Sequence, residues 1–141
     1  MKRIIIHHSL TKDSKTVSWG TIRKYHKSLG WGNIGYHFGI ELARDDYEIF
    51  IGRTLDQKGC HTGSKNIGSI GICFVGNYDD VAPPLEMLKT SIPLVRWLMK
   101  LYDIPIDEIY GHRNFAKKSC PGNRFDMDYY KELIETFGEQ T

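Results

Sequence analysis

One short stretch near the C-terminal end of the chain holds a histidine, a lysine and a cysteine. His112 and Cys120 are eight positions apart, and Lys118 precedes the cysteine by two. Pro121 and Gly122 follow at once, so we expect Cys120 to lie on a rigid turn and not inside a strand or helix. Imidazole and thiolate are ligands that suit zinc. This stretch therefore supplies two of the ligands that a zinc site would need.

A third ligand can come from the other end of the chain. Residues 3–8 are a β-branched run that ends in His7 and His8. Such a run predicts a buried strand, and the end of a buried strand is where side chains emerge into a cleft. One of these histidines, with His112 and Cys120, makes a set of two imidazoles and one thiolate. Three protein ligands leave the fourth position of zinc open for water, which is typical of hydrolytic sites.

Simpler interpretations of the same residues stay open. His112 can be an ordinary histidine, and Cys120 a small buried hydrophobic residue. A structural zinc is another alternative, with Cys60 or His8 as its fourth ligand. Lys118 can be a solvated loop lysine.

Length and composition favour one domain over residues 1–141, because a chain of this length can bury a core of its own. The formal net charge of +2 is too small to indicate binding to nucleic acid. The apolar run before His7 is too short for a signal peptide, and no run reaches membrane-spanning length. We expect a monomer that is made in the cytoplasm without a signal peptide and does not insert into membranes.

The three cysteines are not spaced as a disulfide framework. A reducing compartment of synthesis is the simpler interpretation. A Cys60–Cys73 pair is the alternative, although the apolar run around Cys73 favours a buried core position.

Hydrophobic periodicity predicts the elements that must position these residues. Strands are expected at 3–8, 36–42, 48–53, 69–75 and 107–112, and the second and third of these form a hairpin. Helices are expected after a Ser18 cap up to Gly30, over 85–102 with a kink or break at Pro93, and after an Asp126 cap. Residues 9–17 and 54–69 are expected to be loops. The mixture predicts an α/β fold in which a central mixed sheet is flanked by about three main helices.

Further candidates lie on the second strand and in the loops. If Tyr36 faces the metal, alternation turns His37 away, so we interpret His37 as structural. The Tyr36 phenol can orient a water molecule and relay its proton, or it can be a core tyrosine. His61 and Asn66 lie in the 54–69 loop and have donors suited to peptide carbonyl groups. Arg53 is either at the edge of a groove or a solvated surface arginine.

Several segments resemble the zinc-dependent N-acetylmuramoyl-L-alanine amidases, in the order in which that family has them. They are Ile5-Ile6-His7-His8-Ser9, Gly35-Tyr36-His37-Phe38, His61-Thr62 with Asn66, Ile70-Gly71-Ile72, and Gly111-His112-Arg113 with Lys118-Ser119-Cys120-Pro121. The family includes amidase-type phage lysozymes, bacterial wall-recycling amidases and animal peptidoglycan recognition proteins. The resemblance extends from about residue 3 to about residue 135.

The resemblance implies the same α/β fold with a zinc cleft along one side of the sheet. It implies Zn²⁺ held by His7, His112 and Cys120, with Tyr36 and Lys118 as catalytic residues. It implies that His26 lies at the edge of the peptide-binding groove. Without the resemblance, His26 could be a half-buried packing residue.

The implied substrate is peptidoglycan or a soluble muropeptide, cut at the amide between N-acetylmuramic acid and L-alanine. The compact length favours a phage-type endolysin that acts on the cell wall. A cytoplasmic amidase that recycles muropeptides and a non-catalytic peptidoglycan-binding module are the alternatives. Recognition proteins of this fold commonly lack the cysteine ligand, whereas this chain has Cys120.

Overall fold

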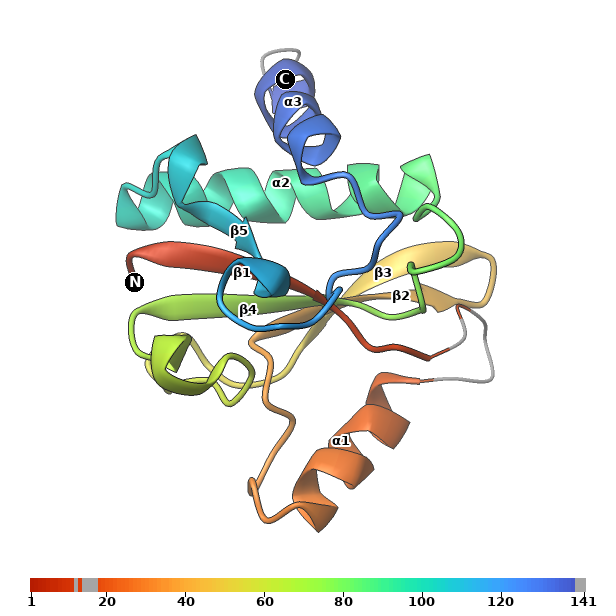
Figure 1. Cartoon of the computed structure of the whole chain (residues 1–141), viewed down its shortest axis with the longest axis vertical. Coiled ribbons are helices and arrows are strands. Elements are labelled where there is room, and N and C mark those ends of the chain that lie inside the picture. Colours follow the sequence, from red (N-terminus) through yellow and green to blue (C-terminus); the bar gives the residue numbers. More distant parts are fainter. Residues whose placement is uncertain (12, 14–17, 139–141) are drawn as a thin grey trace.

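The computed structural model of the chain (Figure 1) describes residues 1–11, 13 and 18–138, so residues 12 and 14–17 of the expected loop lie outside it. Its centre is a sheet in the order β3-β2-β4-β1-β5. The strands are β1 (Arg3–His8), β2 (Phe38–Ala43), β3 (Asp46–Ile51), β4 (Ser69–Phe74) and β5 (Ile109–Gly111). The β2–β3 hairpin is antiparallel, and the other three pairs are parallel. The expected mixed sheet is therefore confirmed.

In the part of the chain that the structure describes, three α-helices cover the two faces of this sheet. They are α1 (Trp19–Ser28), α2 (Leu85–Tyr102) and α3 (Met127–Gly138). Figure 1 shows α1 on one face, with α2 and α3 on the other. Short 3-10 helices occupy Gly63–Asn66, Ile106–Glu108 and His112–Asn114.

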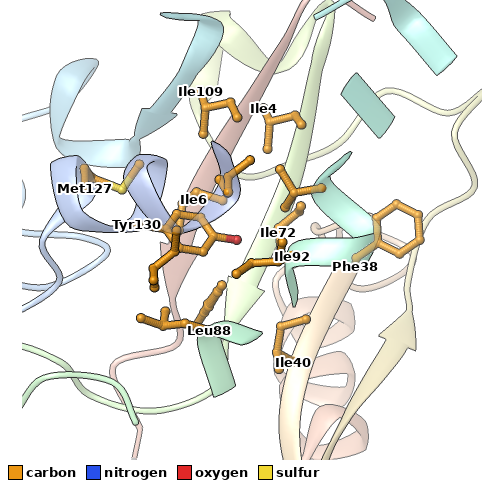
Figure 2. Close-up of a cluster of buried hydrophobic side chains, with 14 of the residues drawn as sticks. Ile4, Ile6, Phe38, Ile40, Ile72, Leu88, Ile92, Ile109, Met127 and Tyr130 are labelled. Carbon is orange, nitrogen blue, oxygen red and sulfur yellow. The ribbon is translucent and has the colours of Figure 1, made fainter. Parts of the chain in front are cut away.

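The larger hydrophobic core lies between the sheet and the α2–α3 layer. Figure 2 shows side chains from four strands and both helices directed toward one another, among them Ile6, Ile72, Ile92 and Tyr130. A smaller cluster lies under α1 and includes Trp19 and Cys73. Because neighbouring residues of a strand point to opposite faces, β1 contributes to the larger core with Ile4 and Ile6 and leaves His7 on the α1 face.

The helix ends agree with the predicted capping residues. The Ser18 hydroxyl accepts a hydrogen bond from the Thr21 N–H at 3.2 Å, and a carboxylate oxygen of Asp126 accepts one from the Tyr129 N–H at 3.0 Å. Gly30 has φ of +84°, which suits a glycine just beyond a helix end.

Several details differ from the sequence prediction: β3 is Asp46–Ile51 where 48–53 was expected, and β5 is only Ile109–Gly111 where 107–112 was expected. Helix α2 runs without a break through Pro93. Pro93 is exposed, so water can reach the carbonyl group whose partner the proline removes, while Ile92 and Val95 anchor the buried face. Strand β2 begins at Phe38, two residues later than expected, although the His37 N–H still donates to the Gly71 carbonyl at 2.9 Å.

Candidate metal centre and surrounding cavity

Two neighbouring parallel strands bring the predicted histidines together. His7 is near the end of β1, and His112 follows the last residue of β5. Because β1 and β5 are paired in parallel, their carboxyl ends meet at one edge of the sheet. The two imidazole ring centroids are 4.7 Å apart.

Cys120 completes a three-residue group with these histidines. One ligand atom from each of His7, His112 and Cys120 lies within 4.8 Å of the others. Nδ1 of His7 is 3.8 Å from the Cys120 sulfur. Tetrahedral zinc with ordinary bond lengths would hold such a nitrogen and sulfur roughly 3.5 Å apart. Among the described residues no fourth histidine, cysteine or carboxylate joins the group, so these residues fit a zinc ion with one open position.

The second β1 histidine is turned away from this group. Nδ1 of His8 accepts a hydrogen bond from the Tyr78 N–H at 3.1 Å. The backbone N–H of His8 instead donates to the Cys120 sulfur at 3.4 Å. Because neighbouring strand residues point to opposite faces, His7 joins the group while His8 provides a supporting backbone contact.

Burial keeps the two imidazoles neutral, as metal ligands must be. It lowers the pKa of His7 well below its usual value, and the nearby His61 and His112 lower it further. Burial is also the main cause of the lowered pKa of His112, followed by the charge of Lys118. The same burial raises the pKa of the Cys120 thiol to about 11, against the opposing effects of the His8 N–H and Lys118. Metal binding at such a thiol releases its proton.

Backbone contacts hold the cysteine loop against the histidine that follows β5. The Arg113 N–H donates to the Cys120 carbonyl at 2.7 Å. The Arg113 guanidinium donates to the carbonyls of Gly122 and Phe125 at 2.8 and 2.9 Å. Arg113, next to His112, thus ties the two ligand-bearing segments together.

A cavity of about 460 Å³ opens over the metal group. Tyr36 and Lys118, the predicted catalytic residues, both line it. The complete lining consists of His7, His8, Leu10, His26, Trp31, Tyr36, Cys60, His61, Asp79, His112, Lys118, Ser119 and Cys120.

The Tyr36 ring lies 5.1 Å from the His7 ring. Burial raises the pKa of the Tyr36 phenol well above its usual value, and Cys73 and Cys120 add to the shift. The phenol therefore keeps its proton at neutral pH and can donate a hydrogen bond into the cavity. Lys118 is exposed, which leaves its ammonium group accessible to a ligand.

His26 and His61, predicted to bind substrate, are both at the cavity but differ in their contacts. His26 is packed between Trp31 and Tyr36, with ring centroids at 4.6 and 5.5 Å, and its Nδ1 accepts the Gly35 N–H at 2.8 Å. His61 lies behind His7, and its Nδ1 is 2.9 Å from the Nε2 of His7. Burial lowers the pKa of His61 to about 3, so this ring is neutral.

Arg53 and Asn66, the other two predicted substrate-binding residues, are not part of the cavity lining. The Arg53 guanidinium donates to three backbone carbonyls, those of Trp31, Ile34 and Lys58. The side-chain oxygen of Asn66 accepts the N–H groups of His61 and Thr62 at 2.9 and 2.7 Å. Both side chains therefore organise the loops that carry cavity residues.

Two further predictions concern residues outside the ligand group. His37 is fully buried, with Nε2 bonded to the Gln57 carbonyl at 2.8 Å and Nδ1 to the Gly71 N–H at 3.1 Å. Its ring is thus engaged with the backbone, as expected of a structural histidine. All three cysteines are free, so the alternative Cys60–Cys73 disulfide is absent, and Cys73 is a fully buried core residue.

Sequence reasoning assigned no role of their own to Trp31, Asp79 and Thr62, although Thr62 belongs to one of the segments that carry the family resemblance. Trp31 lines the cavity and packs on His26, and its position between two glycines was a possible signal. The Asp79 carboxylate accepts the Asn123 N–H at 3.0 Å beside the cysteine loop. The Thr62 hydroxyl is 3.3 Å from the Nε2 of His7. No local pattern marked the contact of Asp79 with Asn123 or that of Thr62 with His7, because each joins segments far apart in the chain.

The sequence matches one protein family over most of its length. Residues 1–123 match the family described as N-acetylmuramoyl-L-alanine amidase. The endolysin of Escherichia phage T7 is 34% identical over 138 residues, which cover 94% of this chain and 86% of that protein.

Solved structures show the same fold. The N-acetylmuramoyl-L-alanine amidase LysC from Clostridium intestinale URNW superposes with a TM-score of 0.83 at 28% identity, covering 95% of this chain and 85% of that one. A complex of the peptidoglycan recognition proteins LCa and LCx with bound tracheal cytotoxin gives a TM-score of 0.78 at 26% identity. The match covers 96% of this chain and 82% of that one. Within the described residues no helix is both long and apolar enough to cross a bilayer.

Proposed function

The chain belongs to the N-acetylmuramoyl-L-alanine amidase family, and we propose that it is a zinc-dependent enzyme that hydrolyses the amide between N-acetylmuramic acid and L-alanine in peptidoglycan. The observation that carries this proposal is the convergence of His7, His112 and Cys120 under an open cavity without a fourth protein ligand. A closed set of four ligands would favour a structural metal.

His7, His112 and Cys120 would hold the zinc ion, and each meets a requirement of that role. The two imidazoles are neutral, and the sulfur has a backbone N–H as a hydrogen-bond donor. When bound in such a site, zinc polarises a carbonyl group and lowers the pKa of water to about 7.

Tyr36 and Lys118 supply the remaining chemistry of amide hydrolysis. Water adds to the carbonyl carbon, the C–N bond breaks, and the leaving amine takes a proton. The Tyr36 phenol, which keeps its proton at neutral pH, can orient the water molecule and relay a proton to the amine. The Lys118 ammonium at the cavity wall can stabilise the negative charge that develops on the carbonyl oxygen, an effect often worth about 3–4 kcal/mol.

The substrate contacts predicted for His26, His61, Arg53 and Asn66 are part of the same proposal. His26 and His61 line the cavity, and His26 can reach a bound peptide from there, whereas His61 has its Nδ1 directed at His7 and its Nε2 buried. Arg53 and Asn66 are bonded to the backbone of loops around the cavity, which favours an indirect role in shaping the groove.

We place the activity at the cell wall, as a phage-type endolysin acting as one domain and a monomer. The similarity to a phage T7 endolysin along 94% of this chain supports that setting. Digestion of intact walls and of soluble muropeptides, compared at equal enzyme concentration, separates a lysin from an enzyme that recycles wall fragments.

The proposal is tested by mass spectrometry of the products from a defined muropeptide. We expect a free L-alanine amino terminus, loss of the reaction after chelation, and its return with zinc. Cys120→Ser should abolish hydrolysis while the variant still binds the peptide. Cleavage at another bond, or parental activity after complete removal of metal, would reject the proposal, and peptide binding without cleavage would identify a recognition module.

A further inference from the structure

The two ring nitrogens of His7 have different surroundings. Nδ1 faces the Cys120 sulfur at 3.8 Å, on the side where the ligand atoms converge. Nε2 faces away, at 2.9 Å from the Nδ1 of His61 and 3.3 Å from the Thr62 hydroxyl oxygen. A metal in this group would therefore meet His7 at Nδ1. The proton of the neutral ring then belongs on Nε2, where it needs an acceptor.

The His61 ring lies in a slot between Gly59 and Gly71, and neither position has room for a Cβ atom. A Cβ atom at position 59 would come within 2.5 Å of the His61 ring, and one at position 71 within 2.7 Å. Both positions are glycines, so the imidazole lies against bare backbone. Gly71 is in the middle of β4, where a glycine weakens a strand and usually marks a close approach of another group.

The backbone of the loop is fixed next to the same ring. Asn66 accepts the N–H groups of both His61 and Thr62 through one side-chain oxygen. The Thr62 hydroxyl is in turn 2.7 Å from the His61 Nδ1. Asn66 thus fixes the backbone of His61 and Thr62, whose side chains contact each other and Nε2 of His7.

One of the two neutral tautomers of the His61 ring can accept this proton. A neutral imidazole carries one ring proton, and the His61 Nε2, which can carry it, is buried without a hydrogen-bond partner among the described residues. With that proton on Nε2, the lone pair of the His61 Nδ1 is free to accept from His7.

We propose that His61 is a positioning residue for the metal centre: its Nδ1 accepts the Nε2–H of His7 and so presents the Nδ1 of His7 to the zinc ion. This inference rests on the proposed zinc function and replaces direct substrate contact as the main role of His61. Acceptors of this kind fix the tautomer and orientation of a metal-bound histidine, and their loss typically weakens metal binding 10- to 100-fold.

The test measures the zinc dissociation constant of the full chain by competition with a chromophoric chelator. His61→Leu removes the acceptor and fills part of the slot, and we expect zinc binding about 10- to 100-fold weaker than in the parent. His61→Asn has a side-chain oxygen near the place of Nδ1 and should retain most of the affinity. Thr62→Val keeps the shape of threonine without its hydroxyl. We expect its zinc affinity to fall less than that of His61→Leu.

The outcomes separate this inference from the proposed function. Parental zinc affinity in a folded His61→Leu variant would overturn the positioning role and leave the zinc enzyme intact. A parent chain that binds no zinc would overturn both. Nitrogen-15 NMR of the zinc-loaded parent gives an answer that needs no variant: we expect His7 to be coordinated through Nδ1 and protonated at Nε2. Coordination through Nε2 would refute the inference.

Discussion

Gly71→Ala perturbs the metal centre without touching any proposed ligand or catalytic residue. The added methyl group would lie 2.7–2.8 Å from three atoms of the His61 ring. Carbon atoms in favourable contact are about 3.5–4.0 Å apart, so the ring must move by roughly 1 Å. Nδ1 of His61 is 2.9 Å from Nε2 of His7, and a displacement of that size is enough to break the hydrogen bond.

This displacement should lower both the stability of the fold and its affinity for zinc. Overpacking of a filled site costs about 1–3 kcal/mol of unfolding free energy, and each kcal/mol lowers the melting temperature of a domain of this size by about 4 °C. Zinc affinity should fall about 10- to 100-fold, as expected for the loss of an acceptor behind a metal ligand.

Gly20→Ala is the matched control for the same glycine-to-alanine change. Gly20 is exposed in α1, and the nearest atom to an added Cβ is at an ordinary 3.7 Å. We expect this variant to be more stable by about 0.5–1 kcal/mol, because alanine is the better helix former, with zinc affinity unchanged. The measurements are thermal unfolding without metal and chelator competition for zinc. If Gly71→Ala matched the parent in both, the steric argument for the His61 slot would be refuted.

Three other substitutions test separate parts of the site and fold. Tyr36→Phe should reduce muropeptide hydrolysis about 10²- to 10⁴-fold with zinc affinity unchanged; parental turnover would remove the phenol from the mechanism. Arg113→Met loses two hydrogen bonds to the Cys120 loop, so its unfolding free energy should fall by about 1–3 kcal/mol, and an unchanged melting temperature would contradict that contact. Burial raises the pKa of Glu41 above 4.5 although the Trp19 N–H opposes the shift. The folded chain thus holds this proton more tightly than the unfolded chain, and ionisation of Glu41 lowers stability as pH rises from about 4.5 through the raised pKa. Glu41→Gln keeps an acceptor for the N–H, so its stability relative to the parent should increase between pH 4 and pH 7, and a constant difference would refute the assignment.

The parts of the fold that follow from local patterns were predictable. The β-branched run predicted the central strand β1, in which His7 and His8 point to opposite faces. Helical spacing and capping residues located α1 and α3, because a side-chain oxygen three residues before a free N–H is a local interaction. The rule that proline breaks a helix failed in α2, where burial on the opposite face outweighs one lost hydrogen bond.

The loop from 54 to 69 was the least predictable part of the site. Its composition predicts a functional loop, with His61 and Asn66 as donors to a bound peptide. In the structure the side-chain oxygen of Asn66 accepts from the loop backbone, and Nδ1 of His61 faces His7. Arg53 likewise donates to three backbone carbonyls, two in the loop between α1 and β2 and one in the 54–69 loop. Such roles have no periodic signature, because the partner depends on how an irregular segment folds onto the sheet.

The amino-acid sequence by itself determined the donor types, two imidazoles and a thiolate, and the alternation that directs one β1 histidine away from the other. These properties depend on residue chemistry and on spacings of a few positions. The tertiary structure decided that residues 7, 112 and 120 converge, which nitrogen of His7 faces the sulfur, and that His61 lies behind it. The reason is geometric: hydrogen bonds act over about 3 Å, and segments 54 and 113 positions apart come that close only when parallel strand pairing has fixed the sheet edge where they meet.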